Sequence, residues 1–283
     1  MVEGGRVLAW MEGNRRRTSR SVGCFSHHEN RYAYSILKKT VLSFIIWLSI
    51  QTMEKSLVLF SGGIDSTTAL YWALGRCGKV HSLTFDYGQR HRIEILMAEK
   101  LVQKLGVPQK IIQVDLQQIG GSALTDAHLP LPQYMNVNKI EEGLPLTYVP
   151  FRNGIFLSMA SAWAEVEGIK EIVCGFHVMD SPNYPDTREQ FVKSMEEAVN
   201  QGTRILPDQD RIQIVAPFVN MKKSDIIKKG LSLGADYSYS VSCYAGAEVP
   251  CQKCSSCILR KKAWEEVGQK DPLILRLEKE GKL

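Results

Sequence analysis

From residue 56 onward, short apolar runs alternate with longer stretches in which apolar residues recur at helical spacing. A short β-branched or apolar run bounded by polar or glycine residues predicts a buried strand, and apolar residues three and four apart predict a helix. By these rules the predicted strands lie at 56–60, 80–85, 110–114, 171–176 and 212–218. The predicted helices lie at 66–76, 91–106, 152–168, 187–202 and 221–234.

Strands that alternate with helices predict an α/β fold with a doubly wound, mostly parallel sheet covered by helices on both faces. Ligands of such sheets bind beyond the carboxyl ends of the strands. We therefore expect a functional site at the loops that follow the strands. These loops are 61–66, 86–91, 115–152, 177–187 and 219–225. The apolar positions of the helix at 152–168 are expected to lie in the core.

The loop after the first predicted strand has the composition of a phosphate site. Gly62 and Gly63 lack Cβ atoms, so backbone N–H groups there can approach a ligand closely. Ser66, Thr67 and Thr68 lie at the start of the next helix, where free N–H groups and the helix dipole favour an anion. The alternative is a tight turn followed by a capped helix, as in many α/β proteins.

The same loop carries an acid, Asp65, and lacks the lysine of the Walker phosphate loop. An acid beside a phosphate group would repel it unless a cation lay between them. Asp65 therefore predicts a Mg²⁺ ion that binds together with the phosphates.

Four of the seven cysteines fall within 15 residues, as Cys243, Cys251, Cys254 and Cys257. Thiolates at C-x-x-C spacing can wrap one side of a Zn²⁺ ion, which takes four ligands in a tetrahedron. We expect one structural Zn²⁺ per chain, which ties the C-terminal segment to the sheet and leaves no open position for catalysis. The alternatives are a redox pair, or cysteines that fill space.

The formal charge of +5 is unevenly distributed. Residues 1–52 contain eight basic and three acidic residues, whereas residues 53–283 contain 27 of each. The charge of residues 53–283 therefore does not indicate a nucleic-acid partner. An apolar run at 41–50 has 10 residues, about half of the ~20 needed to span a bilayer, so we expect no membrane segment.

Three segments are predicted along the chain. Residues 1–52 lack the strand–helix alternation, and we expect them to be disordered or absent from the natural protein, with Met53 as its start. Residues 53–236 are predicted to form the nucleotide-binding α/β domain, and 237–283 the zinc-binding segment packed on it. The absence of a convincing export signal and the cysteine usage together predict a reducing, cytoplasmic location.

The stretch SGGIDS, Ser61–Ser66, resembles the signature of the PP-loop ATP pyrophosphatases, a superfamily similar to the adenine-nucleotide α-hydrolases. Its members split ATP between the α- and β-phosphates and attach AMP to a substrate oxygen. The resemblance implies the doubly wound sheet predicted above, with pyrophosphate in the loop. It assigns ATP binding to the run Phe60, Ser61, Gly62, Gly63, Ile64, Asp65, Ser66, Thr67, Thr68, Ala69 and Leu70.

Further segments narrow the resemblance. The 7-cyano-7-deazaguanine synthase family of the queuosine pathway is similar to this chain over residues 55–268. The shared stretches are FDYGQRHRIE at 85–94, FRN at 151–153, NYPDTREQF at 183–191, and SCYAG with PCQKCSSCILRKKAW within 242–264. One departure is Thr187, where that family often has a cysteine.

The resemblance implies a ligase that uses ATP twice. The carboxylate of 7-carboxy-7-deazaguanine is adenylated, and ammonia then displaces AMP to give an amide. A second ATP activates the amide oxygen, whose loss leaves a nitrile. AMP is the better leaving group, since a carboxylate oxygen leaves very poorly. The resemblance also implies a homodimer.

The resemblance and the predicted loops together assign further roles. Asp65, Arg90, Arg152 and Lys222 are predicted to be catalytic. Arg90 would contact phosphate or carboxylate, as would His91 unless that residue caps a helix. Arg152 opens a helix together with Asn153, and the alternative is an exposed arginine. Lys222 would neutralise phosphate charge unless it is a solvated surface residue.

The substrate base is predicted to bind at one loop. Asp180, Tyr184, Asp186 and Arg188 suit a guanine-like ring, because an acid can accept from ring N–H and amino donors and a tyrosine can stack. Adenine is expected near the strand end at Phe85, held partly by the backbone.

Two other functions remain open at this point. A zinc-containing PP-loop tRNA-modifying thiolase would need a catalytic cysteine and a basic surface, but residues 53–283 have no net charge. The two other cysteines of that part, Cys77 and Cys174, fall in a predicted helix and strand. A zinc-bearing nucleotide-binding module without enzymatic activity is the third possibility.

Overall fold

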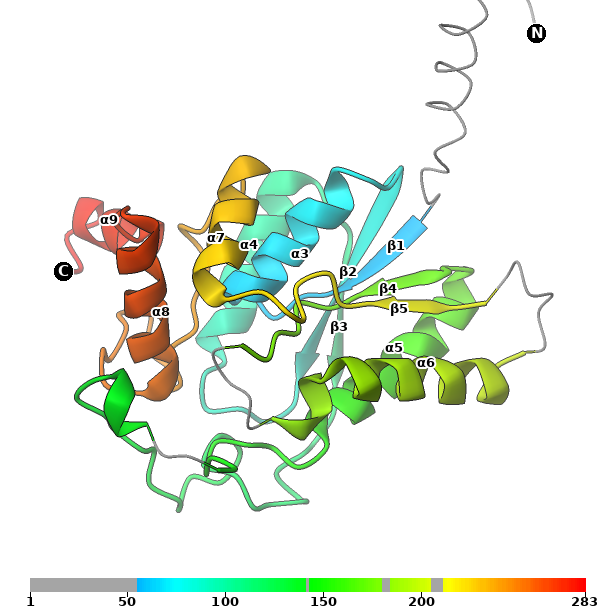
Figure 1. Cartoon of the computed structure of the whole chain (residues 1–283), viewed down its shortest axis with the longest axis horizontal. Helices are drawn as coiled ribbons and strands as arrows, with labels where there is room; N and C mark the ends of the chain where they lie inside the picture. The colour runs from blue at the N-terminus through cyan, green and yellow to red at the C-terminus, as the bar shows by residue number, and fades with distance from the viewer. Residues whose placement is uncertain (1–54, 141–142, 180–183, 205–210) are drawn as a thin grey trace, which may run out of the picture. The chain divides into compact units, whose positions relative to one another are not determined.

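Five parallel strands form one sheet in the order β3-β2-β1-β4-β5 (Figure 1). A computed structural model of the chain describes residues 55–140, 143–179, 184–204 and 211–283. The strands are β1 (Lys55–Leu59), β2 (Lys79–Asp86), β3 (Gln109–Gln113), β4 (Glu171–Val173) and β5 (Gln213–Val215). The predicted doubly wound parallel α/β fold is therefore confirmed.

The described residues belong to one unit, Thr52–Leu283. The predicted extension at 1–52 lies outside the described residues, and the division at residue 236 stays a prediction. No helix of the described part is long and apolar enough to cross a membrane.

The position of β1 in the middle of the sheet explains why its sequence is an apolar run. Successive side chains of a strand point to opposite faces of the sheet, and both faces of β1 are covered. Leu57 packs into the core on one face and Val58 into the core on the other, and both are fully buried.

Helices cover both faces of the sheet (Figure 1). One face packs against α3 (Ile64–Leu74), α4 (Ile93–Leu105) and α7 (Lys223–Ser232). The other packs against α5 (Arg152–Glu167) and α6 (Glu189–Gly202). The chain changes direction across the sheet at β1, which lies between β2 and β4. The carboxyl ends of β1 and β4 therefore form the switch point at which such sheets bind ligands.

Two strands are shorter than predicted, since β4 ends at Val173 and β5 at Val215. The turn that follows β4 approaches the loop after β1. A Cβ atom on Gly175 would lie 2.6 Å from the carbonyl carbon of Asp65. Glycine at this position lets the two loops touch, and the chain leaves the sheet there.

Two C-terminal helices were not predicted, namely α8 (Ser255–Val267) and α9 (Pro272–Lys279). The buried face of α8 contains Cys257 and Arg260 beside Ala263 and Trp264, so its apolar periodicity is broken. Trp264 packs in the same cluster as Ile227 of α7. Two short 3₁₀ helices complete the described elements, η2 (Val137–Lys139) and η3 (Pro185–Thr187).

Candidate active site

A cavity of about 350 Å³ opens at the carboxyl ends of the strands. All five loops that the sequence predicted as its rim contribute to the wall: Asp65, Tyr87, Thr147, His177 and Lys223 represent one loop each. A sixth segment, from Val241 to Leu259, also lines it and was not predicted. This contribution depends on how the C-terminal segment folds back, which no local sequence signal indicates.

The loop after β1 has the geometry of an anion site. The Ser61 and Ser66 hydroxyls lie 3.1 Å apart, and Ser66 Oγ also donates to the Gly63 carbonyl at 3.1 Å. Gly62 has φ +83°, and a Cβ atom there would lie 2.9 Å from the Glu94 carbonyl oxygen. Only glycine takes this conformation and this contact without strain.

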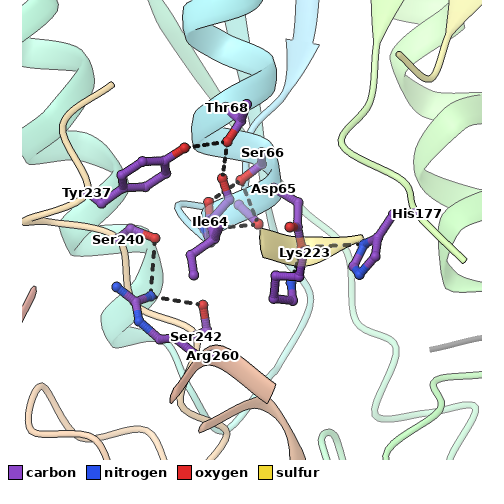
Figure 2. Close-up of polar contacts among 12 residues, drawn as sticks. Ile64, Asp65, Ser66, Thr68, His177, Lys223, Tyr237, Ser240, Ser242 and Arg260 are labelled. Carbon is purple, nitrogen blue, oxygen red and sulfur yellow. Dashed lines mark hydrogen bonds and ion pairs between the residues drawn. The ribbon is translucent and has the colours of Figure 1, made fainter. Parts of the chain in front are cut away.

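The predicted ATP-binding run is only partly exposed to the cavity. Phe60, Ser61, Gly63, Ile64, Asp65 and Ser66 are in the wall. The wall does not include Gly62 or the rest of the run. The Thr68 hydroxyl lies 2.7 Å from that of Tyr237 and donates to the Ile64 carbonyl (Figure 2). Ala69 and Leu70 are core residues. These positions lie on α3, which turns them away from the cavity.

Asp65 lies between two basic groups (Figure 2). Its Oδ2 atom is 2.6 Å from Lys223 Nζ and 3.7 Å from His177 Nδ1. Burial by itself raises the pKa of Asp65, but Lys223 and His177 outweigh it, so the pKa lies below its usual value. Asp65 Oδ1 is buried and has no hydrogen-bond partner in the described part of the chain. An ionised carboxylate with one unpaired oxygen fits a Mg²⁺ ligand.

The lysine at this site is Lys223 rather than the predicted Lys222. Lys223 lines the cavity, whereas Lys222 is exposed, outside the wall, at the N-cap of α7. The two residues lie on different sides of the helix start, a distinction that the sequence alone could not make because both follow the last strand.

Arg152 and Tyr87 form a second polar group in the wall. Arg152 Nη1 donates to the Tyr87 hydroxyl at 3.3 Å, and its guanidinium lies 5.7 Å from the Tyr87 ring centre and 5.8 Å from that of Phe156. Burial opposes the charge of Arg152, but the nearby Tyr87 and other groups keep its pKa above the usual value. Phe156 lines the cavity, so the prediction that apolar residues of this helix lie only in the core was wrong there.

Asp186, which belongs to η3, lies beside the start of α5. Its Oδ2 atom accepts from the Asn153 backbone N–H at 3.0 Å, and Asn153 Nδ2 donates to the Asp186 carbonyl. The other oxygen, Oδ1, is buried without a hydrogen-bond partner in the described ranges. Tyr184 also lines the cavity, and its hydroxyl is 3.2 Å from that of Thr147. Asp180 lies outside the described residues.

Two predicted arginines are not in the cavity wall. Arg90 Nη2 donates to the carbonyl oxygens of Asp126 and Leu129, both at 2.8 Å. Arg188 is exposed at the N-cap of α6. The structure therefore places Arg90 as a loop tie and Arg188 at the surface, because backbone acceptors and solvent satisfy their guanidinium groups.

Glu94 is a wall residue that was not among the predicted site residues. It is 8% exposed, accepts from Gln89 Nε2 at 3.2 Å and lies 3.3 Å from His91 Nε2. Burial raises the pKa of Glu94 to about 8, although the Gln89 hydrogen bond and Arg152 act in the opposite direction. Burial also lowers the pKa of His91 to about 3, helped by Arg152. His91 is therefore neutral and belongs to the cavity wall, and its contact with phosphate or carboxylate stays a prediction.

The raised pKa of Glu94 predicts a pH dependence of stability. The folded chain binds more protons than the unfolded chain between the ordinary pKa of 4.5 and about 8. Glu94 therefore stabilises the fold below pH 4.5, and this contribution is lost as the pH rises through about 8. Between about pH 7 and 8, above the titration of His91, the wild-type free energy of unfolding should fall by up to about 1 kcal/mol more than that of Glu94→Gln.

Urea denaturation at the two pH values measures this difference. Glu99→Gln, on the same helix, is the matched control and should keep the wild-type slope. An unchanged slope in Glu94→Gln would show that Glu94 is already ionised in the folded chain.

The four clustered cysteines come together as predicted. Their sulfur atoms all lie within 4.8 Å of one another, close to the ~3.8 Å expected for sulfurs 2.3 Å from a tetrahedral Zn²⁺. Backbone N–H groups also point at the sulfurs, from Cys251 to Cys243 Sγ at 3.2 Å and from Cys254 to Cys251 Sγ at 3.3 Å. This donor set fits a metal site that has no open position.

The fold and the site define a class of proteins: a parallel α/β sheet with a glycine- and hydroxyl-rich anion loop at its switch point, joined to a four-cysteine cluster. A family model described as "Queuosine biosynthesis protein QueC" matches residues 55–268, and the chain belongs to this family.

Three curated relatives carry the name 7-cyano-7-deazaguanine synthase. The protein of Rickettsia felis is 43% identical over 224 residues, covering 78% of this chain and 99% of its own length. That of Trichodesmium erythraeum is 42% identical over 221 residues, covering 78% and 100%. That of Thermoplasma acidophilum is 44% identical over 220 residues, covering 78% and 91%. Membership of the family that the sequence resembles is therefore confirmed.

Proposed function

We propose that this chain is an ATP-dependent ligase that converts 7-carboxy-7-deazaguanine and ammonia to 7-cyano-7-deazaguanine. Family membership supports the reaction. The observation that carries it in the structure is Asp65, which faces Lys223 beside the anion loop, in the same cavity as a second polar group around Arg152 and Asp186. One cavity thus offers groups for phosphate and groups for a heterocycle.

The reaction consumes two ATP. The substrate carboxylate attacks the α-phosphate of the first, forming an acyl-adenylate and pyrophosphate. Ammonia adds to the acyl carbon. The C–O bond to the adenylate then breaks, AMP leaves with that oxygen, and loss of one proton gives the amide. The amide oxygen attacks the α-phosphate of the second ATP and displaces pyrophosphate. Cleavage of the former amide C–O bond, with loss of both N–H protons, then releases the nitrile and AMP, which keeps that oxygen.

We assign the phosphates to the loop Ser61–Ser66. The Ser61 and Ser66 hydroxyls and free N–H groups at the start of α3 supply donors, and Lys223 supplies positive charge where negative charge builds up. Asp65 would hold Mg²⁺ through Oδ1. When bound, that ion neutralises phosphate charge and orients the phosphates for attack.

We assign the deazaguanine ring to the wall formed by Tyr184 and Asp186. Asp186 Oδ1 is an unpaired acceptor for ring N–H or amino donors, and the residue is 3% exposed. An unpaired buried acceptor is costly in the free enzyme, so a ligand donor there gains binding energy. Arg152 in the same wall suits the substrate carboxylate, because a guanidinium can donate two parallel hydrogen bonds.

The remaining assignments follow from the family resemblance and the cysteine chemistry. We propose a homodimer in the cytoplasm, where reduced thiolates at Cys243, Cys251, Cys254 and Cys257 can hold one structural Zn²⁺. Ammonia enters free or from another protein.

The thiolase alternative is less well supported. Such an enzyme needs a cysteine at the reacting group, and the wall formed by described residues contains none. Cys174 is buried, and the Cys77 thiol donates to Glu171. Adenylation of a small molecule fits the cavity better than attack on a large RNA.

The test is incubation of the full chain with ATP, Mg²⁺, ammonium and 7-carboxy-7-deazaguanine. We expect about two AMP per nitrile formed, because each activation of an oxygen consumes one ATP. Mass spectrometry identifies the nitrile and the intermediate amide. ATP cleavage without nitrile, or sulfur transfer to tRNA in a parallel assay, would overturn the proposal.

A further inference from the structure

The segment before the first clustered cysteine lies against the anion loop. The Val241 backbone N–H donates to the Gly62 carbonyl at 3.1 Å. Ser242 follows and lines the cavity, and its Oγ atom would be 3.8 Å from a Cβ atom placed on Gly63. A hydroxyl from the C-terminal segment is therefore in van der Waals reach of the loop that carries Ser61 and Ser66.

A buried arginine holds this hydroxyl. Arg260 of α8 is 4% exposed and forms a two-pronged ion pair with Asp271, with distances of 2.5 Å and 2.8 Å. Its remaining nitrogen, Nη1, donates to Ser242 Oγ at 3.3 Å and to Ser240 Oγ at 3.4 Å (Figure 2). The ion pair with Asp271 fixes the guanidinium plane, so the position of Nη1 is set before any ligand binds.

The direction of this hydrogen bond decides what Ser242 can do. A guanidinium only donates, so Ser242 Oγ must accept from it. The hydroxyl hydrogen of Ser242 is then available, and the described residues provide no further hydrogen bond for it. A half-buried hydroxyl that has a donor behind it and an open cavity in front is suited to donate to an anion.

Ser240 differs from Ser242 in one respect. Both accept from Arg260 Nη1, but Ser240 is fully buried and does not belong to the cavity wall. The two serines therefore share a partner and differ in access to a ligand.

We propose that Ser242 is a third hydroxyl of the anion site, donating to a phosphate oxygen, and that Arg260 positions it for this contact. The inference rests on the proposed use of the loop for the phosphates of ATP. It makes the C-terminal segment part of the nucleotide site, because Ser242 directly precedes Cys243. The four-cysteine cluster thus helps to set where this hydroxyl lies.

The test is the binding of inorganic pyrophosphate to the full chain in the presence of Mg²⁺, measured by isothermal titration calorimetry. Ser242→Ala should weaken binding about 10-fold, the loss expected for one hydrogen bond to a charged group. Ser240→Ala, the matched control, should stay within about twofold, and Ser242→Thr, which keeps the hydroxyl, should recover most of the affinity.

Three outcomes would contradict the inference. Wild-type affinity in Ser242→Ala would exclude a contact with the anion. Equal losses in Ser242→Ala and Ser240→Ala would show that the packing around Arg260, and not the hydroxyl, matters. Wild-type protein that does not bind pyrophosphate would contradict the anion site itself. Loss in Ser242→Ala alone supports the inference even if no nitrile forms, so the two proposals fail separately.

Discussion

Replacing Lys223 with methionine should lower kcat/KM by roughly 100- to 1,000-fold, the usual cost of removing one group that stabilises transition-state charge. Lys223 Nζ lies 2.6 Å from Asp65 Oδ2 at the wall of the cavity. Without the ammonium group, the phosphates proposed to bind here would lose a positive partner in the cavity wall. The pKa of Asp65 should also rise, since burial raises it and Lys223 is the largest opposing influence. The acid limb of the pH–rate profile should therefore move to higher pH.

Lys222→Met provides the comparison. Lys222 is the neighbour in sequence but is exposed outside the cavity wall, so its loss should change kcat/KM by less than about threefold. Initial rates of AMP release over a range of pH measure both variants. A larger loss in Lys222→Met than in Lys223→Met would contradict the site described above.

Removing one clustered cysteine should have the largest effect on stability. Structural zinc contributes ~10 kcal/mol or more to small zinc-binding domains. We expect one Zn²⁺ per wild-type chain, and Cys254→Ser should lose it and lower the melting temperature by at least about 10 °C. Cys254 is also the N-cap of α8. Serine is a favourable residue at that position, so the substitution does not weaken the helix by itself.

Elemental analysis and thermal denaturation of each variant measure metal content and stability. Cys77→Ser, a half-buried cysteine outside the cluster, is the control and should keep the metal. Treatment of the wild-type chain with a strong chelator should reproduce the Cys254→Ser result. Metal-free wild-type protein with an unchanged melting temperature would show that the cluster does not hold a structural ion.

Much of the architecture could be predicted because it depends on local pattern. The buried strands appear as apolar runs, and each helix from α3 to α7 shows apolar residues at helical spacing. The anion loop and the four cysteines are also local, since their chemistry depends on residues a few positions apart. Helix α8 was not predicted because Cys257 and Arg260 lie on its buried face. A buried polar residue interrupts the apolar spacing by which a helix is identified in the sequence.

Some site residues could be identified only from the tertiary structure. These are the residues whose role depends on the direction of a side chain or on contacts between distant parts of the chain. Adjacent residues on a helix point about 100° apart, so the choice of Lys223 over Lys222 depends on where α7 begins. Arg90 was predicted as a site residue from its place in a loop after a strand. In the structure its guanidinium donates instead to the carbonyl oxygens of Asp126 and Leu129.

By itself the sequence determined the parallel sheet, the glycine- and hydroxyl-rich loop with Asp65, the cysteine cluster and the family. Only the tertiary structure decided that Glu94 faces the cavity and that Ser242 comes to the loop from about 180 residues away. The physical reason is that hydrophobic periodicity and motif spacing are properties of neighbouring residues. The completed site instead depends on long-range contacts, such as that between Arg260 and Ser242, which form only when the chain folds back on itself.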